Sequence, residues 1–79
     1  MARLLFFGRL RDAVGAGELA VNVPAGIGDV QSLRDWLSRD HPALAGASVK
    51  VAVNGALAPG NPALTPDDEI AFMPPMSGG

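Results

Sequence analysis

The sequence contains no cysteine and no tyrosine, and it has one histidine and one tryptophan among 79 residues. Without cysteine the chain forms no disulfide, no thiolate metal site and no cysteine nucleophile. Any sulfur that it handles must therefore lie on something other than a side-chain thiol. The single histidine, His41, stands beside a proline, and nothing in the pattern supports a Ser-His-Asp triad around it.

Long apolar runs and an excess of positive charge are also missing. The longest strongly apolar run, residues 4–7, is far too short to cross a bilayer, and we expect no secretory leader because the first residues lack its pattern. Six basic residues stand against eight acidic ones and are scattered, so we expect no nucleic-acid partner. The short apolar run and the N-terminal pattern lead us to expect no membrane partner and a cytoplasmic location. Adjacent carboxylates at residues 67–69 fit a solvated turn, and we expect no metal.

The apolar pattern predicts five strands and one main helix. Residues 3–7 indicate a strand covered on both faces, and alternation over residues 18–23 indicates a strand with one buried side. Asp29 is a good N-cap for a helix whose apolar stripe ends before His41-Pro42. Asn54-Gly55 predicts a hairpin between a strand at 49–53 and a short return strand at 56–58. The last strand is expected at residues 69–73.

One helix across a small mixed sheet is the economical packing of these elements. Two hairpins joined by a right-handed crossover place the first and last strands side by side and parallel. This is an α+β fold of the β-grasp, or ubiquitin-like, type. We expect a domain at residues 1–73 and an extended C-terminal tail at residues 74–79.

The predicted tail has the properties of a delivery device. Pro74 and Pro75 favour a stiff, extended segment, and six residues reach roughly 20 Å. Gly78 and Gly79 lack a β-carbon and can thread a channel too narrow for side chains. Met76 and Ser77 lie between these pairs. The alternative is an ordinary frayed terminus.

The terminal carboxylate of Gly79 is an anion at neutral pH and a poor electrophile, since a free α-carboxyl has a pKa of about 3.5. It becomes reactive once it is converted to an acyl-adenylate. The chain has no Gly-x-x-x-x-Gly-Lys loop to hold a nucleotide, so that step needs an ATP-using partner. A thiocarboxylate made from the adenylate would be a reactive sulfur nucleophile.

Three segments carry a resemblance to a known family: LLFFGRLRDAVG at residues 4–15, VAVNG at residues 51–55 and DDEIAFMPPMSGG at residues 67–79. The sequence resembles the small subunits of molybdopterin synthase, which belong to the ubiquitin-like sulfur carriers. The pattern Phe-x-Pro-Pro-x-Ser/Thr-Gly-Gly at the end is specific to this branch. The resemblance covers the whole chain.

The resemblance implies a non-catalytic carrier with no bound cofactor. An adenylating enzyme would use ATP to activate Gly79, and the tail would then insert into a large synthase subunit that supplies the catalytic side chains. The carrier's thiocarboxylate would give sulfur to a cyclic pyranopterin monophosphate, in an assembly of two small and two large subunits. Four residues stand at positions that contact partner proteins in the family: Phe7, Arg11, Leu57 and Met73.

The sequence departs from the family pattern at three positions. Gly8 stands where alanine is common, and Met73 and Met76 replace an aromatic residue and a valine. At the two methionines we expect altered packing without lost function, because methionine adapts to its surroundings at interfaces. Two alternatives stay open on the same fold. One is a sulfur carrier for thiamine synthesis or tRNA thiolation, and the other is a modifier joined through Gly79 to lysines of target proteins.

Overall fold

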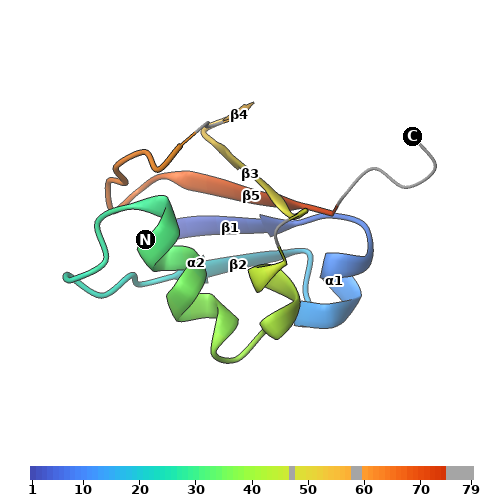
Figure 1. Cartoon of the computed structure of the whole chain (residues 1–79). Coiled ribbons are helices and arrows are strands. Elements are labelled where there is room, and N and C mark those ends of the chain that lie inside the picture. The colour runs from blue at the N-terminus through green and yellow to red at the C-terminus, as the bar shows by residue number, and fades with distance from the viewer. Residues whose placement is uncertain (47, 58–59, 75–79) are drawn as a thin grey trace.

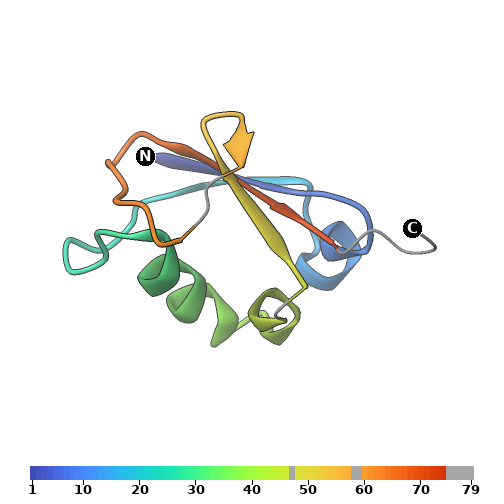
Figure 2. The same cartoon turned by 45° about the horizontal axis from the view of Figure 1, so that its top comes forward.

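The computed structural model describes residues 1–46, 48–57 and 60–74, which form one mixed sheet with helices packed on one face (Figure 1). The elements in chain order are β1 (Ala2–Phe6), α1 (Arg9–Val14), β2 (Glu18–Val21), α2 (Val30–Ser38), the 3₁₀ helix η1 (Pro42–Ala45), β3 (Lys50–Val53), β4 (Ala56–Leu57) and β5 (Glu69–Met73). Figure 2 shows α2 and η1 together below the sheet. The predicted main helix is α2, and η1 was not foreseen.

The strand order across the sheet is β2-β1-β5-β3-β4. β1 and β5, the first and last strands, are parallel neighbours at the centre, with Leu4 opposite Ile70 and Phe6 opposite Phe72. All other strand pairs are antiparallel. The predicted parallel pairing and the β-grasp architecture are therefore confirmed.

The core lies between the sheet and α2. Phe6 and Phe72 stack with ring centroids 5.5 Å apart, and both are almost fully buried. Leu33 of α2 and Leu44 of η1 meet the same cluster and have no exposed surface. Asp29 caps α2 by accepting a hydrogen bond from the Ser32 amide at 2.8 Å, as its position predicted.

Three expectations about the strands need correction or lie outside the described residues. β1 is covered on one face only, because no helix of the described chain lies on the other face; Arg3 is exposed and Leu5 half-buried there. β2 ends at Val21, two residues before the predicted end. The return strand β4 is described for Ala56–Leu57, and residue 58 lies outside the described residues.

The hairpin after β3 is held by a side-chain network. Asn54 and Gly55 have φ values of 50° and 85°, as their sequence predicted for a tight turn. Asn54 accepts a hydrogen bond from the Glu69 amide at 3.0 Å and donates one to Asp68 at 3.0 Å. Asp68 also accepts from the amide and the hydroxyl of Thr65 at 2.8 Å and 2.7 Å. These bonds tie the hairpin to the start of β5.

The same network makes stability depend on pH. Hydrogen bonds from the Thr65 amide, and then from Asn54 and the Thr65 hydroxyl, lower the pKa of Asp68 below its usual 3.8. A lowered folded-state pKa stabilises the fold above the unfolded-state pKa, and this contribution is lost as the pH falls through about 4 and below. We expect Asp68→Asn to flatten the fall of the urea midpoint between about pH 5 and 2.

Asp40→Asn is the matched control, because the Asp40 carboxylate forms no hydrogen bond or ion pair within the described ranges. Its midpoint should follow the wild-type pH curve. Identical pH curves for Asp68→Asn and the wild type would contradict the assigned role of Asp68.

Candidate functional site

The chain leaves the sheet at the end of β5, its central strand. Met73 is the last residue of β5 and lies opposite Lys50 of β3. Pro74 follows and is half-buried. Proline has no amide hydrogen, so it cannot extend the ladder of hydrogen bonds. The predicted tail residues beyond it, Pro75, Met76, Ser77, Gly78 and Gly79, lie outside the described residues and stay a prediction.

The face of the sheet opposite α2 carries an apolar surface, which we call the outer face. Its central row crosses four strands, because Leu5 lies opposite Ala71, Ala71 opposite Ala52, and Ala52 opposite Leu57. Leu57 is 67% exposed. Alternation also places Met73 on this face, one register position beyond Phe72.

Phe7 extends the outer face to the point where the chain leaves. Its amide donates a hydrogen bond to the Phe72 carbonyl at 3.1 Å, so β1 stays beside β5 for one more residue. Because Phe6 points into the core, alternation directs Phe7 to the outer face, and it is 47% exposed. Large apolar side chains gathered on an exposed surface mark an interaction site.

The predicted partner-binding residues therefore fall into two groups. Phe7, Leu57 and Met73 share the outer face. Arg11 lies on α1, and its Nε would be 3.2 Å from a β-carbon built on Gly17, so its side chain runs along the α1–β2 connection. Arg11 forms no ion pair in the described part of the chain.

Sequence reasoning missed the centre of the outer face. The sequence pattern places Leu5 in a strand covered on both faces and does not single out Ala52 or Ala71. The available signal was one small side chain in each of two neighbouring strands, Ala52 of β3 and Ala71 of β5, which leaves room for a partner to approach the sheet. Finding it required the strand register, which depends on long-range pairing.

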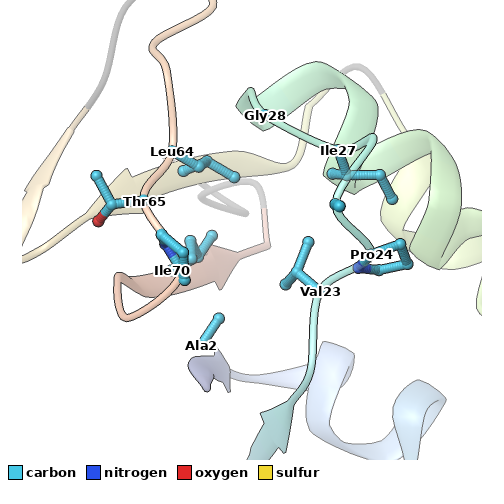
Figure 3. Close-up of a pocket in the computed structure, with 10 residues that line it drawn as sticks. Ala2, Val23, Pro24, Ile27, Gly28, Leu64, Thr65 and Ile70 are labelled. Carbon is cyan, nitrogen blue, oxygen red and sulfur yellow. The ribbon is translucent and has the colours of Figure 1, made fainter.

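A second feature is a cavity of about 260 Å³ lined mostly by residues with apolar side chains (Figure 3). Ala2, at the start of β1, and Ile70, near the start of β5, lie at its wall, with Val23, Ile27 and Leu64 around them. It therefore lies at the end of the sheet opposite the point where the chain leaves β5. Its lining includes no titratable side chain, and its one hydroxyl, on Thr65, donates to Asp68. The cavity therefore contributes no reactive side chain to chemistry at the predicted tail.

The carboxylates that could suggest a metal site are engaged elsewhere. Asp67 pairs with the N-terminal amine at 2.9 Å, and Glu69 pairs with Arg3 at 3.3 Å. Within residues 1–46, 48–57 and 60–74, no group of three or more ligating side chains could hold a metal ion. In the same ranges, no helix has the length and apolar character needed to cross a membrane.

Comparison with known proteins identifies the family. The profile of the ThiS family matches residues 4–79. This chain belongs to the ThiS family. The match begins within β1 and takes in the outer face and the whole predicted tail, and it confirms the relationship to ubiquitin-like sulfur carriers that the sequence indicated.

Two bacterial relatives of this ThiS-family chain align over the full length of both partners. The molybdopterin synthase sulfur carrier subunit of Escherichia coli strain K12 is 35% identical over 85 residues. The subunit of the same name from Haemophilus influenzae is 31% identical over 83 residues. They confirm the branch of the family that the final motif indicated.

A solved structure with a similar fold is SAMP1 of Haloferax volcanii, a small archaeal modifier protein. It superposes with a TM-score of 0.78 at 30% identity, over 99% of this chain and 98% of the other. The likeness confirms the β-grasp fold.

Proposed function

We propose that this chain is the sulfur-carrier subunit of a molybdopterin synthase and that Gly79 carries the sulfur as a thiocarboxylate. The observation that carries the proposal is the full-length match to two relatives of that name, together with the match of the ThiS family to residues 4–79. The exposed outer face supports it, because a carrier must dock on each enzyme that it serves.

The chemistry begins outside this chain. A Gly79 carboxylate oxygen attacks the α-phosphate of ATP on an adenylating partner, and pyrophosphate leaves. A hydrosulfide ion, supplied by a sulfur donor, then attacks the acyl carbon; the bond from that carbon to AMP breaks, and Gly79 is left as a thiocarboxylate. The unhindered glycine carbonyl favours both attacks. The carrier itself binds no cofactor, and we place it in the cytoplasm because the activation consumes ATP.

Delivery uses the tail and the outer face together. We propose that the large synthase subunit docks on Phe7, Leu57 and Met73, with Arg11 at the margin of the contact. The residues beyond Pro74 then thread a narrow channel of that subunit. The thiocarboxylate sulfur of Gly79 is transferred to a cyclic pyranopterin monophosphate, and hydrolysis of the C–S bond returns Gly79 to a carboxylate. The large subunit supplies the catalytic side chains, and two carriers serve two large subunits in the assembly.

A protein modifier is the second candidate, and the likeness to an archaeal modifier protein favours it. In that case the activated Gly79 would form an amide bond with a lysine of a target protein. The other sulfur pathways, thiamine synthesis and tRNA thiolation, use the same first step and differ in the acceptor. The protein that co-purifies with the chain therefore distinguishes these functions.

Intact mass spectrometry of protein produced with its native activating enzyme tests the proposal. We expect a species in which one terminal oxygen is replaced by sulfur, and we expect a large synthase subunit to co-purify. A chain that keeps its oxygen under these conditions would contradict the carrier function. Lysine-linked conjugates without a thiocarboxylate would favour the modifier.

A further inference from the structure

The corner between β1 and α1 lies against the point where the chain leaves the sheet, as Figure 1 shows for α1 and the end of β5. Gly8 forms this corner with φ 57° and ψ −136°, a backbone conformation that L side chains rarely adopt. Two hydrogen bonds hold the corner. The Leu10 amide donates to the Phe7 carbonyl at 3.1 Å, and the Arg11 amide donates to the Gly8 carbonyl at 3.2 Å.

The ring of Pro74 occupies the space that a side chain at Gly8 would fill. A β-carbon built on Gly8 would lie 2.8 Å from Cγ of Pro74 and 3.6 Å from its Cδ. The first separation is far shorter than a van der Waals contact between carbon atoms. Among the described glycines, Gly8 is the one at which a β-carbon would come this close to another residue. Two residues 66 positions apart thus fit together because one of them lacks a side chain.

This contact matters because the sheet cannot direct the chain beyond Met73. The described ladder of β5 ends there, and Pro74 has no amide hydrogen to continue it. What fixes the direction at this point is the restricted φ of proline together with the surface on which its ring rests. That surface is the hydrogen-bonded corner at Gly8.

We propose that in this chain, where glycine replaces the alanine that is common in the family, Gly8 is a positioning residue for sulfur delivery: its missing side chain seats the Pro74 ring and thereby sets the direction in which the chain leaves the domain beyond Pro74. The inference rests on the proposed carrier function and deepens it. The outer face decides how tightly the partner binds, whereas the seat at Gly8 decides where the bound carrier aims its reactive end.

Chemical synthesis of the 79-residue chain with a terminal thiocarboxylate separates the two consequences of a side chain at position 8. Gly8→Ala places a methyl group against Pro74 and also strains the backbone. Gly8→D-Ala accepts a positive φ without strain, and its methyl group points away from the β-carbon position that would meet the Pro74 ring. We expect Gly8→Ala to lower kcat for sulfur transfer about fivefold or more, because small displacements of reacting groups are costly, while Kd for the large subunit changes less than about twofold.

Gly8→D-Ala is expected to keep the wild-type kcat. Equal losses for the two variants, or a wild-type kcat for Gly8→Ala, would overturn the proposed seat. A parallel rise in Kd with unchanged kcat would also overturn it, because Gly8 would then act through docking.

A double-mutant cycle with Pro74→Ala tests the pair directly. Pro74→Ala removes the ring carbon that a side chain at position 8 would meet, so adding Gly8→Ala to it should cost much less than Gly8→Ala alone. If the two effects on kcat simply multiply, the residues act independently and the proposal fails. Urea midpoints of all four proteins show how much of each loss comes from the fold.

A structural readout separates this inference from the proposed function. We expect nuclear Overhauser effects between the α-protons of Gly8 and the ring protons of Pro74 in the isolated wild-type chain. Their absence refutes the seat whatever the protein carries. If they are present and the wild-type thiocarboxylate transfers no sulfur to the pterin substrate, the carrier function fails while the seat stands.

Discussion

Deleting Gly79, or adding one residue after it, is expected to reduce sulfur transfer below detection while leaving the domain folded. The reason is that the proposed reactive atom belongs to the terminal carboxylate, which either change moves or replaces. A thiocarboxylate one residue short would also stop short of the acceptor, and reacting groups must meet within a few tenths of an ångström of their productive position.

Transfer is measured by mass spectrometry of the carrier and by formation of the dithiolene product. A one-residue extension before Met1 is the matched control, since it lengthens the chain by the same amount at the other end of the sheet and should leave transfer intact. Urea midpoints near the wild-type value for the C-terminal variants would show that the fold is unaffected. Full transfer by either C-terminal variant would refute the mechanism.

Phe72→Ala is expected to destabilise the fold, whereas Phe7→Ala is expected to weaken binding to the partner, although both residues lie at the central strand pair. Phe72 has no exposed surface and stacks on Phe6, so its truncation should cost about 3–5 kcal/mol in the free energy of unfolding. A domain of this size has a stability near the low end of the usual ~5–15 kcal/mol, so most of it is lost.

Phe7→Ala should leave the urea midpoint almost unchanged, because the side chain is half exposed on the outer face. It should instead weaken the complex with the large subunit tenfold or more, as truncation of an aromatic anchor commonly costs ~2 kcal/mol at an interface. Denaturation curves and a binding titration on both variants test the pair. Equal destabilisation by both substitutions would place Phe7 in the core and remove it from the docking surface.

The elements with local signals could be predicted from the sequence. Asn54-Gly55 specified its turn because few other residues adopt positive φ, and Asp29 specified the start of α2 through a side-chain bond to a nearby amide. The order of hairpin, helix and hairpin was enough to predict the parallel pairing of β1 with β5, since the handedness of crossovers leaves few alternatives.

Features that depend on two distant segments could not be predicted. The apolar run at the start of the chain suggested a strand covered on both faces, and only the complete sheet shows that Leu5 belongs to an open face. The contact between Gly8 and Pro74 depends on one backbone torsion and on a residue at the far end of the chain. Arg11 and Phe7 are close in sequence, yet one lies along α1 and the other on the outer face.

The parallel pairing of β1 and β5 has a mechanical consequence. A partner that bound the predicted tail would apply force to β5 along the strand axis. β1 and β3 flank β5 on both sides, and their hydrogen bonds to it are roughly perpendicular to that force. Such bonds share the load and must break together, whereas bonds at a strand end could be peeled apart one at a time. We therefore expect the domain to stay folded when force is applied to the C-terminal end of β5.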